Sequence, residues 1–254
     1  MGILNVTPDS FSDGGAFADT ERAVAHARAM AAAGADIIDI GGESTRPGAA
    51  AVNAEEEVRR VAPVIEQLGG LTISVDTTKA MVAERALAAG ARIVNDISAL
   101  RFDVRMADVV RDAGAGLVLM HMQGTPRTMQ ESPRYDNVVA EVLDFLADRI
   151  AFAESRGIKK TQIAIDPGIG FGKTVEHNVA LLARVEAFCK LGCPVLVGAS
   201  RKSFIGKLLG REPQARLAGS VAVAVWAVTH GARIVRVHDV AETVDAVRMV
   251  EAIQ

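Results

Sequence analysis

The stretch AAAGADIIDIG, residues 31–41, contains the unit from which the fold can be predicted. A helical segment ends at a glycine, and a short apolar run follows it. Nearly the same pattern recurs as LAAGARIVND at 87–96, RDAGAGLVLMH at 111–121 and THGARIVRVHD at 229–239. The glycine of each copy stands where a helix needs a left-handed C-terminal cap. The chain therefore alternates helices with buried strands.

Short apolar runs of this kind occur eight times: 3–5, 37–40, 72–76, 93–95, 117–120, 163–166, 195–198 and 234–238. Apolar strands that alternate with helices are typical of parallel sheets covered on both faces. Eight such units in 254 residues predict an α/β fold, a (β/α)8 TIM barrel, which is typically about 250 residues long. No linker divides the chain, so a single domain over 1–254 is expected.

Besides the connection after the fifth strand at 121–133, two βα connections are long, the first at 6–18 and the second at 41–53. Both are rich in Gly, Pro, Ser and Thr, so we expect mobile loops. They lie on the rim where barrel enzymes carry their active sites, and they hold Asp9, Phe11 and Arg46. Surface loops without a role are the alternative interpretation. Long loops in compact domains are, however, usually functional or disordered.

Composition and charge exclude several classes of function. The chain is 50% hydrophobic with a net charge of −3, which gives no overall attraction to nucleic acid or to anionic membranes. Its longest apolar stretch, 221–228, is too short to span a bilayer, and no secretory signal is visible. Two cysteines cannot form a disulfide framework. A cytoplasmic protein is expected.

Polar side chains follow several of the predicted strands. Asp76 and Asp166 each end an apolar run, and a carboxylate at a partly desolvated barrel mouth needs hydrogen-bond donors. A planar heterocycle with an amidine-like edge would supply two N–H donors, and Asn95 could pair with the rest of such a ring. Capping of the following helix is the alternative role for an aspartate at this position.

Cations gather after the last two strands. Arg236 and His238 are two residues apart, so both side chains should lie on one face of a strand, and Lys202 follows the seventh strand. Barrel enzymes often bind phosphate at this place; a solvated charge cluster is the alternative. Mg2+ needs only one or two protein oxygens beside phosphates, and Asn5 and Asp9 could supply them.

Other motifs fail when their full pattern is required. Gly172-Lys173-Thr174 looks like the end of a phosphate-binding P-loop, but position 167, where the earlier glycine is needed, is Pro167. Lys173 is therefore expected at the surface near a helix start. The chain has no His-x-His pair and no HExxH motif, so a zinc site is not expected.

Seven motifs, in order, together resemble the dihydropteroate synthase family, the folate-pathway enzymes inhibited by sulfonamides. They are GILNVTPDSFSDGG (2–15), ESTRPGA (43–49), DTTK (76–79), VNDIS (94–98), DPGIGFGKT (166–174), GASRKSFIG (198–206) and RVHDV (236–240). The resemblance covers essentially the whole chain. One departure is Ile169, where many relatives have Phe.

The resemblance implies a pterin-binding transferase. Such enzymes condense 6-hydroxymethyl-7,8-dihydropterin pyrophosphate with p-aminobenzoate, giving 7,8-dihydropteroate and pyrophosphate. It implies Mg2+ as cofactor, small-molecule substrates, a homodimer and an SN1-like loss of pyrophosphate. The implied catalytic residues are Asp76, Asp166, Lys202, Arg236 and His238.

The same resemblance assigns residues to each part of the substrates. The pterin would be bound by Asp76, Asn95, Met120, Asp166 and Lys202. The pyrophosphate would be bound by Asn5, Arg46, Arg236 and His238. The p-aminobenzoate would be bound by Phe11, Thr45, Arg46, Pro47, Phe171 and Ser200. The metal ligands would be Asn5 and Asp9.

Two alternatives remain open from the sequence. A pterin-dependent methyltransferase would share the pterin carboxylates, but it would not explain the loop at 7–11 together with the 200–202 segment. A non-catalytic pterin-binding paralogue would be expected to lose loop or anion-binding residues, and this chain keeps them.

Overall fold

The structure is a computed structural model that describes residues 1–7, 15–44 and 51–253, with the side chains of 15–18 left out. The strands lie close to the predicted apolar runs. They are β1 (Gly2–Asn5), β2 (Ile37–Gly41), β3 (Thr72–Asp76), β4 (Ile93–Asp96), β5 (Gly116–Met120), β6 (Ile163–Asp166), β7 (Leu196–Val197) and β8 (Ile234–Val235).

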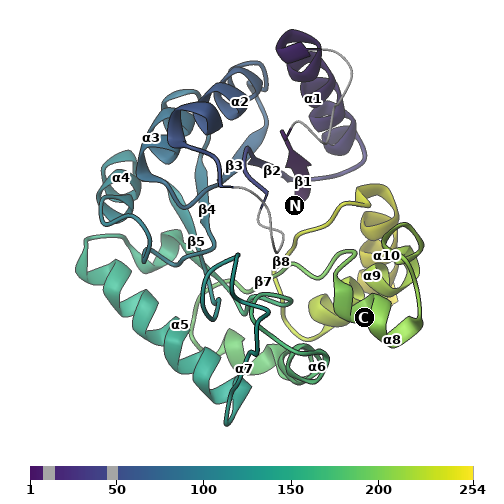
Figure 1. Ribbon diagram of the computed structural model, residues 1–254. Helices are drawn as coiled ribbons and strands as arrows, with labels where there is room; N and C mark the ends of the chain where they lie inside the picture. The colour runs from purple at the N-terminus through teal and green to yellow at the C-terminus, as the bar shows by residue number, and fades with distance from the viewer. Residues whose placement is uncertain (8–14, 45–50, 254) are drawn as a thin grey trace.

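These strands form a parallel barrel. β1 to β6 pair in chain order, and β7 pairs with β8. Two single bridges, Ile165 to Val195 and Gly2 to Val237, join the two parts. At the second junction the Ile3 N–H donates to the Val237 carbonyl at 3.0 Å. The predicted (β/α)8 barrel is therefore confirmed, and Figure 1 shows its helices as a ring around the strands.

The last two strands are shorter than the runs 195–198 and 234–238 predicted from sequence. Val195 and Val237 each form only one bridge, and that bridge goes to the strand on the far side of the junction. The register of β7 against β8 covers two residue pairs, and the backbone hydrogen bonds between the two segments run to the Val195 and Val197 carbonyls. Closing the barrel thus divides the apolar run between two neighbours, which an apolar pattern alone does not reveal.

Helices follow the strands: α1 (Gly15–Ala32), α2 (Ala54–Glu66), α3 (Ala80–Ala88), α4 (Met106–Ala113), α5 (Val138–Ser155), α6 (Val175–Leu182), α7 (Val185–Cys189), α8 (Ser203–Leu209), α9 (Leu217–Thr229) and α10 (Val240–Ile253). Because α1 begins at Gly15, the prediction that the first loop reaches residue 18 is wrong. The four repeated glycines have positive φ, as the cap prediction requires: Gly34 at 99°, Gly90 at 119°, Gly114 at 63° and Gly231 at 97°.

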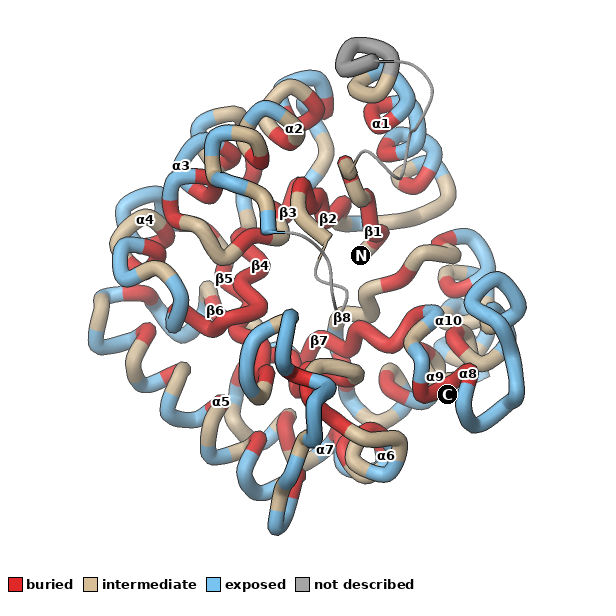
Figure 2. The backbone as a smooth tube through the Cα atoms, in the orientation of Figure 1, coloured by how far each residue is buried: buried red, intermediate tan, exposed pale blue. Residues whose placement is uncertain are grey.

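The hydrophobic core lies between the barrel and its ring of helices. Ile38, Ile40 and Val75 on the strands are fully or almost fully buried, and so are Val64 and Val142 on helices. Figure 2 shows the strands buried while the outward faces of the helices are exposed. Because the helices pack against the outer side of the strands, the barrel can carry polar side chains at its mouth.

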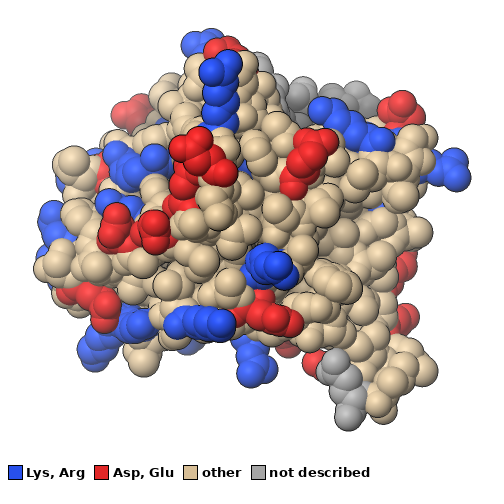
Figure 3. Space-filling model, turned by 90° about the horizontal axis from the view of Figure 1, so that it is seen from below, with Lys and Arg blue, Asp and Glu red and all other residues tan. Residues whose placement is uncertain are grey.

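The charged surface is mixed. Lys and Arg side chains alternate with Asp and Glu on the face shown in Figure 3, in keeping with the net charge of −3. Among the described residues, no helix is both long and apolar enough to cross a membrane.

Candidate active site

Strand register brings the predicted polar residues together at the C-terminal mouth of the barrel. Gly41 at the end of β2 pairs with Asn5 on one side and with Asp76 on the other. Asp76 in turn pairs with Asn95, and Met120 pairs with Asp166. The rim is therefore continuous from β1 to β6, because parallel strands end at the same edge.

Arg236 occupies the middle of this mouth. Its Nη2 donates to Asp76 Oδ2 at 2.7 Å, and its Nε donates to Asp39 Oδ2 at 2.5 Å. Asp76 caps no helix: α3 has Lys79 as its N-cap residue and no side-chain cap. The arginine side chain is only 20% exposed, so the alternative of a solvated charge cluster is wrong for this residue.

Asp39 is a site residue that the sequence analysis missed. It is fully buried, and it lies in β2 within the apolar run IIDI. The available signal was a charged residue in the middle of a buried strand, since such a charge must find a partner. The partner, Arg236, is 197 residues away in the chain, so local sequence could not identify it.

Burial changes the protonation of two groups in the mouth. It raises the pKa of Asp76 to about 7, against the opposing charge of Arg236 and with help from the charges of Asp39, Glu57 and Asp96. It lowers the pKa of Lys202 to about 8, against the opposing charge of Asp166. Both groups therefore titrate close to neutral pH, which is common at functional sites.

Asp166 is held by the turn that follows it. Its Oδ1 accepts from the Gly168 N–H at 2.7 Å, and burial raises its pKa while Lys202 opposes the shift. Helix α6 begins only at Val175 with Thr174 as its cap, so Asp166 caps a turn and not a helix. Lys202 Nζ donates to the Ile169 carbonyl and lies 4.4 Å from the centre of the Phe171 ring.

An apolar wall lies beside these groups. Met120, predicted to contact the ligand, is 2% exposed and belongs to a cluster with Ile97, Met122 and Met129, against which Phe171 packs. The cluster is separate from the main core. Polarizable methionines beside an aromatic ring form a suitable surface for a flat heterocycle, so the wall and the rim together can bind one.

The two segments after β7 and β8 are joined by His238 and Ser200. The backbone N–H of His238 donates to Ser200 Oγ at 3.2 Å, and its Nδ1 lies 3.0 Å from the same oxygen. Next to them Arg201, with a left-handed φ of 57°, is paired with Asp239. These contacts bring the two predicted anion-binding segments together. They place Ser200 beside a residue of the predicted pyrophosphate group.

The prediction that Lys173 lies at the surface is wrong. Lys173 is only 3% exposed. Its Nζ donates to the Phe171 carbonyl at 2.9 Å and lies 3.0 Å from His121 Nδ1. Burial lowers the pKa of Lys173. The lysine thus supports the turn after β6 from inside, because the chain folds back over it.

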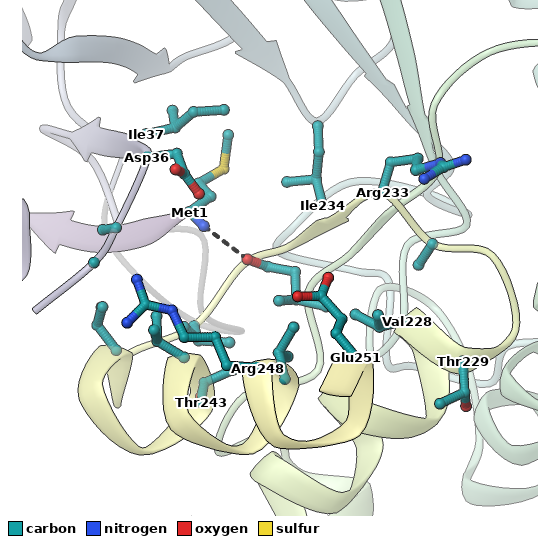
Figure 4. A pocket seen from close by; sticks show the side chains of 18 of the residues that line it. Met1, Asp36, Ile37, Val228, Thr229, Arg233, Ile234, Thr243, Arg248 and Glu251 are labelled. Carbon is teal, nitrogen blue, oxygen red and sulfur yellow. Dashed lines mark hydrogen bonds between the residues drawn. The ribbon is translucent and has the colours of Figure 1, made fainter. Parts of the chain in front are cut away.

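Cavities lie at both ends of the barrel. The larger one, of about 690 Å3, lies at the end opposite the rim and is lined by residues such as Met1, Asp36, Arg233 and Glu251 (Figure 4). None of the predicted site residues lines it. The smaller one, of about 290 Å3, is lined by Asp76 and Ile97 among others. Convergent polar groups, not volume, therefore locate the site.

Some of the predicted residues lie outside the described part of the chain: Asp9, Phe11, Thr45, Arg46 and Pro47. The predicted mobility of the two long loops falls largely on these same segments. Within the described ranges, no group of three His, Cys, Asp or Glu side chains could hold a metal ion. The amide oxygen of Asn5, at the end of β1, lies at the mouth. It is 3.9 Å from the point where a Cβ on Gly41 would lie.

Comparisons with known proteins show which family the chain belongs to. The family described as pterin binding enzyme matches residues 1–238. The dihydropteroate synthase of Escherichia coli strain K12 is 53% identical over 255 aligned positions, covering 99% of this chain and 90% of the relative.

Solved structures of dihydropteroate synthases also match the whole chain. The Xanthomonas albilineans dihydropteroate synthase with 4-aminobenzoic acid has 55% identity and a TM-score of 0.94, covering 100% of this chain and 92% of that one. The same organism's enzyme in complex with 7,8-dihydropteroate has 52% identity and a TM-score of 0.91, again with coverage of 100% and 92%. This chain therefore belongs to the pterin-binding enzyme family, among the dihydropteroate synthases.

Proposed function

We propose that this protein condenses 6-hydroxymethyl-7,8-dihydropterin pyrophosphate with p-aminobenzoate and releases pyrophosphate. One observation carries the proposal most directly: Asp76, Asn95 and Asp166 meet Arg236 and Lys202 at one barrel mouth. Full-length relatives named dihydropteroate synthase support it. They do not favour the two alternatives, a pterin-dependent methyltransferase and a non-catalytic paralogue.

The pterin ring is assigned to the buried side of the mouth. Asp76 and Asp166 are carboxylates with partly satisfied oxygens, and such groups pair well with the N–H donors of an amidine-like edge. Asn95 adds an amide, and Met120 adds apolar surface. The charge of Lys202 acts on Asp166, and its Nζ lies 4.4 Å from the centre of the Phe171 ring, so it can meet a ring acceptor.

The pyrophosphate is assigned to the side of β8 and β1. Arg236 and His238 supply donors, and Arg46 would join them from the second loop. Asn5 would hold Mg2+ by its amide oxygen, with Asp9 as a further ligand, since Mg2+ prefers oxygen and needs few protein ligands when phosphates are present. When bound, Mg2+ supplies positive charge against the departing pyrophosphate.

The p-aminobenzoate is assigned to the loops above the mouth. Phe171 offers a ring face beside the pterin site, and Ser200 offers a hydroxyl near His238. The remaining contacts would come from Phe11, Thr45, Arg46 and Pro47. An aromatic amine is already nucleophilic at neutral pH, so the reaction needs no strong base on the protein.

The chemistry fits an SN1-like displacement. The bond from the exocyclic CH2 to the pyrophosphate oxygen breaks, and its electron pair leaves with the pyrophosphate. Arg236 and His238 stabilise the negative charge that develops on the leaving group. Asp76 and Asp166 lie on the ring side, where they can stabilise the positive charge left on the pterin. The amine then forms the new C–N bond and loses a proton to water.

The test of this function is pyrophosphate release when both substrates and Mg2+ are mixed with the protein. Product formation should require both substrates. If the leaving group departs first, the pterin pyrophosphate with Mg2+ alone should show slow positional oxygen exchange. Exchange that occurs only with bound p-aminobenzoate would instead indicate a concerted displacement, and no pyrophosphate release at all would reject the function.

Replacing Asp166 with asparagine should weaken pterin binding by about 1.5–3 kcal/mol, the scale for losing one charged hydrogen-bond partner. The shape is kept, and only the charge facing the ring donors is removed. Calorimetric titration with a pterin that lacks the pyrophosphate gives the loss directly. Wild-type affinity in Asp166→Asn would remove this carboxylate from the ring site.

Pterin affinity should be greatest between about pH 7 and about pH 8. Below its pKa of about 7, Asp76 takes up a proton and no longer accepts from the ring. Above its pKa of about 8, Lys202 loses its charge. Affinity should then fall by about tenfold per pH unit on each side, as expected for one linked proton. In Lys202→Met the alkaline limb should disappear while the acid limb stays; an alkaline limb unchanged in this variant would contradict the assignment.

A homodimer stays a prediction from the family resemblance, and a cytoplasmic location stays a prediction from the cysteine count and the lack of a visible secretory signal. Exposed apolar side chains on α8 and α9 support the first: Leu208 is 56% exposed, Leu209 54% and Trp226 47%. Sedimentation of the purified protein at several concentrations would test the assembly state.

A further inference from the structure

Asp39 is a carboxylate with no access to solvent in the middle of β2. Alternation along the strand places it on the same face as Gly41, which is the face lining the barrel interior. Its register partner on β3 is Ser74, which is also fully buried. Asp39 thus lies one layer below the mouth, behind the groups assigned to the substrate.

One oxygen of Asp39 serves two of those groups. Oδ2 accepts from Arg236 Nε at 2.5 Å and from Asn95 Nδ2 at 3.0 Å. Arg236 also donates from Nη2 to Asp76. The carboxylates therefore hold the guanidinium by two of its nitrogens, Nε and Nη2, while Nη1 forms no hydrogen bond with the described residues. A guanidinium fixed in this way presents its remaining N–H groups in one direction.

The contact with Asn95 fixes the orientation of its amide. An ionised carboxylate accepts hydrogen bonds and cannot donate them. The amide NH2 must therefore face Asp39, and the carbonyl oxygen must lie on the other branch of the side chain. Without Asp39, either branch could face a ligand. With it, the Asn95 Oδ1 is the atom that can accept from a ring N–H, and the second N–H of the amide stays available to a ring acceptor.

We propose that Asp39 is a positioning residue, which orients the Asn95 amide and the Arg236 guanidinium for a dihydropterin pyrophosphate. The inference rests on the proposed function. Asp39 itself does not touch the substrate, because it is fully buried behind both residues. A carboxylate that served only as counter-charge to Arg236 would affect the stability of the fold, and its effect on pterin affinity would not depend on the Asn95 side chain.

The first test compares two replacements of Asn95. Asn95→Asp places a second carboxylate against Asp39. It should therefore weaken the binding of a pterin that lacks pyrophosphate about tenfold more than Asn95→Ala does. Calorimetric titration at constant pH gives both affinities. Equal affinities in the two variants would mean that Asp39 does not orient the amide, and this comparison leaves Asp39 itself intact.

The second test removes the charge of Asp39. Asp39→Asn should bind the same pterin about tenfold more weakly than the wild type. In the Asn95→Ala background the same change should cause a much smaller further loss, because the amide through which Asp39 acts on the ring is gone. Ser74→Ala, the matched control in the same interior layer, should keep wild-type affinity. Equal losses from Asp39→Asn in both backgrounds would overturn the proposal.

The outcomes separate this inference from the proposed function. If the wild type fails to bind the pterin at all, the proposed function fails. If the wild type binds it and neither Asp39→Asn nor Asn95→Asp shows the expected loss, only the positioning role fails.

Discussion

Replacing Arg236 with alanine should lower the free energy of unfolding by about 3–5 kcal/mol, the scale for removing one partner of a buried ion pair. The guanidinium holds Asp39 by Nε and Asp76 by Nη2. Without it two carboxylates share a buried site, and the pKa of Asp76 should rise further, because the charge of Arg236 is what opposes the effect of burial. Urea denaturation near pH 8 should show the full loss.

A double variant tests the cause of this loss. Arg236→Ala with Asp76→Asn removes one of the two carboxylates, so part of the lost stability should return. Pyrophosphate binding should not return, because the cation is still absent. A single variant as stable as the wild type would show that Arg236 does not neutralise the interior. No recovery in the double variant would indicate that lost packing, not charge, is responsible.

The sequence alone suggests a narrower role for Arg236. Its place on the last strand indicates a residue that binds only the leaving group. The structure gives it a second role within the barrel, as partner of Asp39 and Asp76. Its replacement should therefore weaken ring binding too, since both carboxylates and the Asn95 amide depend on one network.

Local features of the sequence were sufficient to predict most of the barrel. Helix ends were marked by glycines that adopt positive φ, such as Gly34 and Gly114, and the runs from β1 to β6 lie within one residue of the strands found. Both signals depend on neighbouring residues only. The ends of β7 and β8 were predicted less well, because they depend on which strand pairs with Val195 and Val237 as the barrel closes.

Within the site, the residues at the strand ends were predicted and those behind them were not. Asp76, Asn95 and Asp166 follow apolar runs, so period and position indicated them. Asp39 lies inside such a run, and Lys173 lies in a glycine-rich turn that looks exposed in sequence. Their burial depends on Arg236 and on His121, which are distant in the chain. Contacts of this range cannot be read from local patterns.

Replacing Gly168 with alanine should lower the free energy of unfolding by about 2–5 kcal/mol, the sum of two separate costs. The first is the left-handed backbone, with φ of 70°. The second is steric: a Cβ at this position would lie 1.8 Å from the His121 carbonyl oxygen. That carbonyl belongs to the residue that continues β5, where the His121 N–H donates to the Asp166 carbonyl at 3.0 Å, so it cannot move aside freely.

The turn must shift instead, and Asp166 should shift with it, because the Gly168 N–H is bonded to its Oδ1. Pterin affinity should therefore fall along with stability. Gly114→Ala is the matched control: Gly114 has φ of 63°, and nothing lies within 4 Å of its Cβ position. It should lose only the backbone cost of about 1–2 kcal/mol and keep wild-type affinity. Equal losses of stability in the two variants, measured by urea denaturation, would show that the overlap with His121 is relieved at no cost. Wild-type pterin affinity in Gly168→Ala would show that the turn after β6 does not hold Asp166 in place.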